Sequence, residues 1–207
     1  MSLCFADPTL PAIDLFVIPS GDADAIPAQA QAWAQTQGFS GQLGRCLTVP
    51  AADGSIACAL VGYGSAEVRA RGRFHVGAAA RKLPVGNYRI AGGLSGADLE
   101  EAALGWLLES YRFDSYTSPA SPAATLAAPA GIDADRIAVI AAGEALSRDL
   151  INTPASDMGP SELEDAFRVL GKEHDAAVTV ITGDDLLSGN FPMIHAVGRA
   201  STRAPRL

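Results

Sequence analysis

Two kinds of segment are missing from this sequence. It has no uninterrupted run of about 18 apolar residues, the length that a membrane-spanning helix requires. Residues 1–8 contain neither the basic segment nor the apolar core of a secretory signal. We therefore expect no membrane partner and no secretion.

Positive charge and cysteine are also scarce. The net charge is −8, whereas proteins that bind nucleic acids or anionic membranes need a basic surface, so we expect no nucleic-acid partner. The three cysteines are Cys4, Cys46 and Cys58. Their odd number, wide spacing and lack of a C-x-x-C pair argue against a disulfide framework and a structural zinc site. They favour reduced thiols and a cytoplasmic location.

Hydrophobic residues, in contrast, make up 48% of the chain, enough for a packed core. Short β-prone runs alternate with helical patterns, which predicts an α/β domain with a largely buried sheet. Asp53-Gly54 separates two of the β-prone runs, as in a hairpin. We expect strands at residues 13–19, 46–51, 55–62 and 88–94, and helices at residues 25–37, 67–83 and 99–111.

The second part of the sequence begins with a change in composition. Ser, Pro, Ala and Gly dominate residues 117–130, which indicates an exposed connection at a domain boundary. A helix is expected to start after Gly159, with Pro160 in its first turn and Glu162 at its positive end. Elsewhere the patterns predict strands at residues 137–140, 178–181 and 194–198, and helices at residues 144–151 and 184–187.

Two motifs in this part carry a family resemblance. Residues 148–154 read R-D-L-I-N-T-P and precede Gly159-Pro160 and a helix. They closely resemble the R-D-L-x-N-T-P pattern at the domain junction of the leucyl aminopeptidase (cytosol aminopeptidase) family. Residues 196–201 (A-V-G-R-A-S) and 205–207 (P-R-L) are similar to its A-V-G-x-(G/A)-S-x-x-x-P-R-L pattern. Earlier, L-V-G-Y-G at 60–64 and Y-R-F-D at 111–114 also resemble the family.

The resemblance implies a fold and a domain organisation. The family's N-terminal domain is a macro-domain-like α/β module, and a helix connects it to the catalytic domain. We accordingly expect a non-catalytic α/β domain at residues 1–118 and a linker at residues 119–135. Residues 136–207 would hold the connecting helix and the truncated start of the peptidase domain.

The resemblance also implies an activity. Members are di-metal exopeptidases that use zinc or manganese, release N-terminal residues from peptides, and assemble as homo-oligomers, usually hexamers. The family's metal ligands and catalytic lysine and arginine lie beyond the P-R-L motif. We therefore assign no catalytic, cofactor-binding or metal-binding residue here. The full-length enzyme would hold two divalent metal ions, Mn or Zn, while this chain is expected to hold none and to be inactive alone.

Possible metal ligands can be weighed directly. Asp184 and Asp185 are adjacent at an expected helix start, where acids act as caps far more often than as bridging ligands. The histidines are His75, His174 and His195. None of them has a second histidine or a carboxylate at i+3 or i+4, as a helical metal motif requires.

Other motifs have both a functional and a structural interpretation. Residues 92–96 (G-G-L-S-G) lack the spacing of a hydrolase elbow and favour a turn. Residues 62–65 (G-Y-G-S) could cradle a phosphate, but Glu67 stands where G-x-G-x-x-G needs glycine. Three further sets of residues favour structural roles. Cys46 and Cys58 are expected in the core, and Asn152-Thr153 at a helix end. Arg69, Arg71 and Arg73 are expected on a solvated or subunit-contact surface.

Two hypotheses of different class follow. The first is an aminopeptidase polypeptide of which these residues are the front part. The alternative is a non-catalytic module for oligomerisation or for binding a nucleotide-like ligand.

Overall fold

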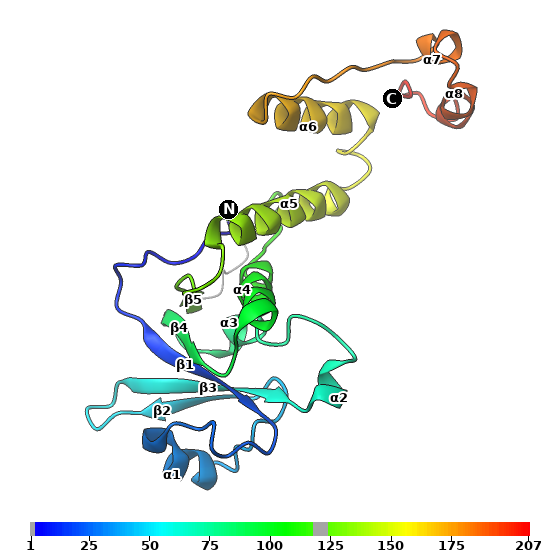
Figure 1. Cartoon of the computed structure of the whole chain (residues 1–207). Helices are drawn as coiled ribbons and strands as arrows, with labels where there is room; N and C mark the ends of the chain where they lie inside the picture. Colours follow the sequence, from blue (N-terminus) through cyan, green and yellow to red (C-terminus); the bar gives the residue numbers. More distant parts are fainter. Residues whose placement is uncertain (1–2, 118–123) are drawn as a thin grey trace. The chain divides into compact units, whose positions relative to one another are not determined.

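The computed structural model describes residues 3–117 and 124–207 (Figure 1). The chain divides into two compact units, Met1–Leu146 and Ser147–Leu207. The division falls inside helix α5 (Ala134–Asn152).

A five-stranded sheet forms the centre of the first unit. Its order is β2-β3-β1-β4-β5. Strands β1, β3, β4 and β5 run parallel, and β2 pairs antiparallel with β3, so the predicted hairpin is confirmed. The predicted α/β class is confirmed as well. The strands are β1 (Ile13–Pro19), β2 (Cys46–Pro50), β3 (Ile56–Gly64), β4 (Gly86–Gly92) and β5 (Ala124–Leu126).

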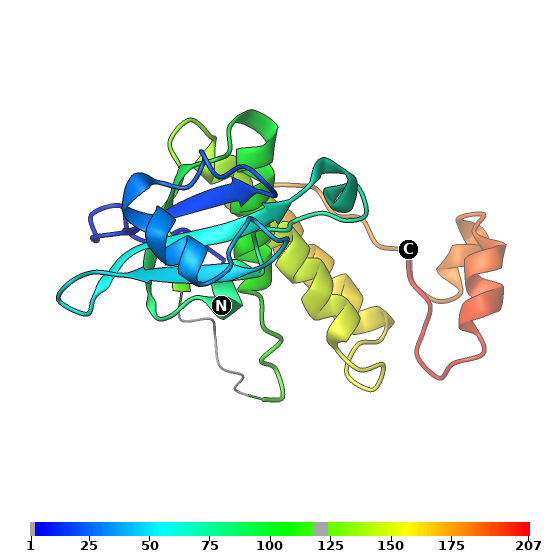
Figure 2. The same ribbon diagram turned by 90° about the horizontal axis from the view of Figure 1, so that it is seen from below.

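Helices cover both faces of this sheet (Figures 1 and 2). Alternate residues of a strand point to opposite faces. Leu15 and Val17 of β1 pack on the side of α3 (Ala79–Lys82) and α4 (Gly96–Glu109). On the opposite side, Ile18 packs with α1 (Ala28–Thr36). The central strands β1 and β3 are therefore largely buried on both faces, as their apolar sequences require.

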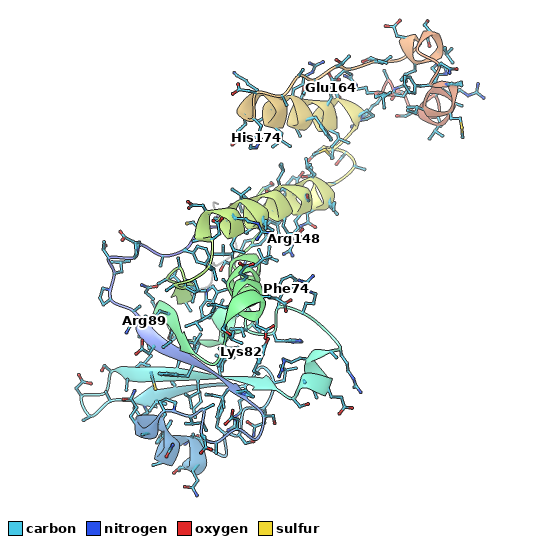
Figure 3. All side chains as sticks on the ribbon, in the orientation of Figure 1. Phe74, Lys82, Arg89, Arg148, Glu164 and His174 are labelled. Carbon is cyan, nitrogen blue, oxygen red and sulfur yellow. The ribbon has the colours of Figure 1, made fainter. Side chains whose placement is uncertain are left out.

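The helix expected at residues 67–83 is interrupted. It is replaced by α2 (Ala66–Arg69) and α3, with a non-helical stretch between them in which Phe74 has a positive φ of 58°. The Phe74 backbone N–H donates to Glu101 Oε1 (3.1 Å), and Arg73 Nε donates to Glu101 Oε2 (3.1 Å). Figure 3 shows Phe74 beside α4. Contacts with α4 thus outweigh the local helix propensity of this segment.

The prediction of an exposed connection at residues 117–130 is wrong for part of its length. Residues 118–123 lie outside the described residues. Ala124–Leu126 form β5, which pairs with Gly86–Tyr88 of β4, and Ala124 and Leu126 are buried. Three residues are too few to show a strand pattern within a Pro- and Ala-rich stretch. The linker proposed at residues 119–135 remains a prediction.

Residues 137–140 are helical, so the strand predicted there is wrong. Helix α5 is continuous over 19 residues and contains the helix expected at residues 144–151. Its buried residues are Ile137 and Ala141, one helical turn apart, in a cluster with Leu3 and Leu107. A short apolar run has no diagnostic period of its own. Its packing as part of a helical stripe decides the structure.

After the end of α5, the second unit contains three helices and extended connections. They are α6 (Pro160–Glu173), α7 (Asp185–Ser188) and α8 (Pro192–Gly198). Gly159 is the N-cap of α6, as the sequence predicts. Its N–H donates to Glu162 Oε2 (3.0 Å). The short helix predicted at residues 184–187 is confirmed by α7.

The two strands predicted in this unit are wrong. Residues 194–198 lie in α8, which Pro192 opens at its first turn. Residues 178–181 join no sheet. Ile181 does exchange two backbone hydrogen bonds with Leu207 (2.9 and 3.0 Å). A β-prone run forms a strand only where a neighbouring strand pairs with it.

Candidate functional site

The candidate metal ligands do not converge. Among residues 3–117 and 124–207, no group of three or more His, Cys, Asp or Glu side chains is placed to hold a metal ion. His195 Nε2 lies 3.0 Å from Asp184 Oδ1, which makes a pair. Asp184 is the N-cap of α7, and its side chain is 96% exposed. His174 ends α6, at the opposite end from Glu164 (Figure 3).

His75 and Arg69 stabilise the loop that follows β3. His75 Nε2 lies 3.0 Å from the Arg69 carbonyl oxygen. The Arg69 guanidinium lies 4.2 Å from the centre of the Tyr63 ring and donates to the Tyr63 and Gly64 carbonyl oxygens (3.3 and 2.9 Å). Burial, the largest influence, raises the pKa of Tyr63. Because Arg73 pairs with Glu101, the arginine run is divided between two local roles.

The backbone at residues 62–65, the possible phosphate cradle, is already hydrogen bonded. Gly62 N–H donates to the Arg45 carbonyl oxygen (2.8 Å), and Gly64 N–H donates to that of Gly41 (2.9 Å). Val68 N–H donates to Ser65 Oγ (3.3 Å). A Cβ on Gly62 would overlap the Gln42 carbonyl oxygen. The space that a side chain would fill at these glycines is therefore occupied by the protein's own chain. This geometry favours a turn over an anion-binding site.

The G-G-L-S-G segment also has a structural explanation. Gly93 has a φ of 91°, and an added Cβ would overlap the Val17 carbonyl oxygen of β1. Ser95 is the N-cap of α4. These features describe a strand-to-helix turn that closes tightly over the end of β1.

The cysteines have the character of structural residues. Cys58 is buried in β3, Cys46 is partly buried in β2, and Cys4 is exposed. All three are free thiols. Burial is the main influence that raises the pKa of Cys46 and of Cys58, which reduces the thiolate fraction that a nucleophile needs.

The motif at residues 148–154 forms a helix end. Helix α5 stops at Asn152, two residues before Pro154, and Thr153 Oγ1 donates to the Asp149 carbonyl oxygen (2.7 Å). The predicted structural role of Asn152-Thr153 is therefore confirmed.

An open groove of about 1220 Å³ lies within the second unit. Phe167 and Met193, which line it, are 60% and 81% exposed. Glu164 is the carboxylate in its wall, and it is engaged by Arg168 and Arg206. The groove can take up apolar surface but has no converging acids for hydrolysis among the described residues. Its apolar lining includes Leu163, Phe167, Val178, Val180, Met193 and Val197.

Sequence reasoning missed the importance of Glu164 and Arg206. The signal was available in part, because Arg206 is the arginine of the P-R-L motif. Its partner could not be found from the sequence, since 42 positions separate the two residues.

Comparison with known families decides the relationship. Residues 21–129 match the M17 aminopeptidase N-terminal domain. Residues 145–207 match the catalytic domain of the cytosol aminopeptidase family. The chain belongs to the M17 cytosol aminopeptidase family. It contains the family's N-terminal domain and the start of its catalytic domain.

Individual relatives agree with this assignment. A probable cytosol aminopeptidase of Leifsonia xyli subsp. xyli is 30% identical over 93% of this chain, and one of Rhodococcus jostii is 33% identical over 82%. The matches span only 40% and 37% of those relatives. The crystal structure of the Coxiella burnetii cytosol aminopeptidase is 30% identical, with a TM-score of 0.84 over 100% of this chain and 45% of its own. Bottromycin maturation enzyme BotP is 26% identical, with a TM-score of 0.74 over 95% of this chain and 45% of its own.

No helix within the described part of this M17 family chain is both long and apolar enough to cross a membrane.

Proposed function

We propose that this chain is the front part of a metallo-aminopeptidase that releases N-terminal residues, often leucine, from peptides. The observation that carries the proposal is the match of two domains of one peptidase family, in order, along a single chain. The names of the relatives support the same activity. The residues of this chain would support the enzyme without taking part in the chemistry.

The metal dependence is proposed for the longer enzyme. BotP has also been solved in complex with Mn. The donors in the described part of this chain do not fit a two-metal centre, because no cluster of three or more ligands forms. We therefore propose that the two ions, Mn or Zn, are held by residues beyond the P-R-L motif, and we derive no catalytic step from the residues present here.

The domain organisation is also a proposal. Residues 1–118 would be the non-catalytic domain, residues 119–135 the linker, and residues 136–207 the connecting helix with the start of the peptidase domain. The interval between the two family matches, residues 130–144, supports a junction near the start of α5. Limited proteolysis should cut first within residues 119–135. A first cut inside α4 would contradict these boundaries.

A cytoplasmic homo-oligomer, hexameric as the resemblance implies, completes the proposal. The naming of relatives as cytosol aminopeptidases supports the location. Light scattering of the purified chain measures its assembly, and a strictly monomeric chain would contradict self-association through these residues.

The alternative is a module without any peptidase role. A nucleotide-like ligand is not favoured, because the amides of Gly62 and Gly64 already donate to backbone carbonyls. Oligomerisation alone is compatible with the fold.

The deciding experiment compares two proteins. The 207-residue chain should not hydrolyse leucine p-nitroanilide with added Mn or Zn. The product of the complete reading frame that contains it should do so if that frame continues into the G-K-G-x-x-F-D segment, which in the resembled family lies beyond the P-R-L motif and belongs to the catalytic region. Turnover that follows the 207-residue chain through purification would overturn the assignment of chemistry to residues outside it. A stop codon directly after Leu207 would favour the stand-alone module.

A further inference from the structure

Residues 201–207, here called the strap, run along one wall of the groove in the second unit. They contain no helix and only the isolated bridge between Thr182 and Arg206. Side chains, more than regular structure, must therefore account for their position.

Arg203 fixes the first part of the strap. Its Nη1 and Nη2 atoms donate to the carbonyl oxygens of Ala155 (3.1 Å) and Ser156 (2.6 Å). Nη1 also lies 4.0 Å from Glu162 Oε2. This attachment connects the strap to the residues directly before α6 and to its first turn.

Arg206 fixes the second part through a carboxylate that is shared with α6. Its Nη1 pairs with Glu164 Oε2, while Glu164 Oε1 accepts from Arg168 Nε (2.6 Å). The side chains of Glu164 and Arg206 are only 12% and 28% exposed. Arg206 Nε is buried and has no acceptor among the described residues. The partial burial of this guanidinium therefore depends on Glu164.

Backbone bonds complete the attachment on the far side of the strap. Gly183 N–H donates to the Pro205 carbonyl oxygen (2.9 Å), and Ile181 and Leu207 exchange two bonds. The charged pair between Glu164 and Arg206 is the strongest single connection available to this end of the strap.

We propose that residues 201–207 are a charge-latched strap, in which the Glu164–Arg206 pair holds this wall of the open groove in place against α6. Loss of the negative charge on Glu164 releases Arg206 from α6, separates Leu207 from Ile181 and widens the groove. The latch is a conformational device of the second unit and does not depend on peptidase activity.

The direction of its pH response follows from the groups around Glu164. Two cations face this carboxylate: Arg168 from α6 and Arg206 from the strap. The hydrogen bonds from Arg168, first, and from Arg206 hold the pKa of Glu164 below its usual range. The latch is therefore complete above the pKa of Glu164 in the unfolded chain. It is lost as the pH falls through the lowered pKa of the folded state.

Hydrogen exchange of the 207-residue chain at neutral pH tests the proposal. Glu164→Gln removes the charge and keeps the shape. Asp165→Asn is the matched control, because it removes the same charge from the next residue of α6, which is exposed and has no side-chain partner among the described residues. With Glu164→Gln, the amides of Ile181, Gly183 and Leu207 should exchange roughly tenfold faster, in line with the loss of a charge-assisted hydrogen bond. With Asp165→Asn, they should stay within about twofold of the unaltered chain, as expected for an exposed surface change.

Amides of Leu60 and Val61 in β3 report whether the first unit of each variant stays folded, and amides within α6 report the same for the second unit. A second pair of variants tests the other partner: Arg206→Gln should accelerate exchange at Ile181, and Arg206→Lys should recover most of the protection. Equal exchange in Glu164→Gln and Asp165→Asn would overturn the latch. So would equal acceleration at Ile181 and throughout α6, because that pattern would show general loosening of the helix.

Discussion

Substitution of Gly93 tests whether glycines occur at the carboxyl ends of the parallel strands because a neighbouring backbone leaves no room for a Cβ. Gly93 lies directly after β4 with a φ of 91°. A Cβ at this position would overlap the Val17 carbonyl oxygen and lie 2.8 Å from the carbonyl carbon. Val17 belongs to the central part of the sheet and is fully buried. Gly93→Ala should therefore force β1 and the turn after β4 apart.

The magnitude follows from two contributions that a control can separate. A positive φ costs a residue with a Cβ about 1–2 kcal/mol. Overpacking against a rigid neighbour adds about 1–3 kcal/mol. Gly54 has a similar φ of 84° in the β2–β3 turn, but nothing lies within 4 Å of an added Cβ. Gly54→Ala should therefore cost about 1–2 kcal/mol, and Gly93→Ala about 2–5 kcal/mol.

Urea unfolding, followed by tryptophan fluorescence, measures both variants. Trp106 is 1% exposed in the core beside the sheet and so reports on the first unit. If the two variants lose the same free energy of unfolding, the close approach to Val17 does not matter. The explanation of residues 92–96 as a tight structural turn would then fail.

Three further perturbations test other parts of the molecule. Trp33→Phe removes the hydrogen bond from Trp33 Nε1 to the carbonyl oxygen of Thr48 in the edge strand β2 (3.0 Å). Urea unfolding should show a free energy of unfolding that is lower by about 0.5–1.5 kcal/mol. Glu162→Gln should fray the first turn of α6, as measured by the Leu163 amide chemical shift. Bonds from the Glu162 backbone, Ser161 and Gly159 lower the pKa of Glu162, so its contribution is present above the unfolded-state pKa and disappears as the pH falls through the folded-state pKa. A chain that ends at Asn152 should unfold as cooperatively as the first unit of the intact chain. The reason is that the three main apolar clusters of the described residues involve only residues up to Ala145. Broad, non-cooperative unfolding, measured by circular dichroism, would contradict this.

Strands β1 to β4 were predictable because their apolar runs are bounded by clear turn residues. Ile13–Pro19 ends at Pro-Ser-Gly, and Asp53-Gly54 separates β2 from β3. Helix α6 was equally clear, since Gly159, Pro160 and Glu162 mark its start. In each case the local signals and the tertiary environment favour the same structure.

The errors occurred where tertiary contacts oppose the local pattern. Glu101 of α4 binds the backbone of Phe74 and holds a non-helical loop within an otherwise helical sequence. Ile137 belongs to a β-prone run, yet it packs as one turn of α5. β5 is recognisable only from its pairing with β4. None of these partners can be identified from the segment itself.

The functional conclusion depends on residue motifs more than on geometry, and the distribution of burial explains why. Among the described residues after Leu146, Leu186 is the one large apolar side chain that is fully buried. Phe167, Val169, Met193 and Val197 are each at least 60% exposed. A catalytic centre needs side chains that are locked by packing and by supporting hydrogen bonds. In this unit, such locking occurs around Glu164, Arg203 and Arg206, which hold segments together without forming a reactive centre. On the proposed function, the second unit would supply part of a framework for catalysis, and the chemistry would require further residues packed against that framework.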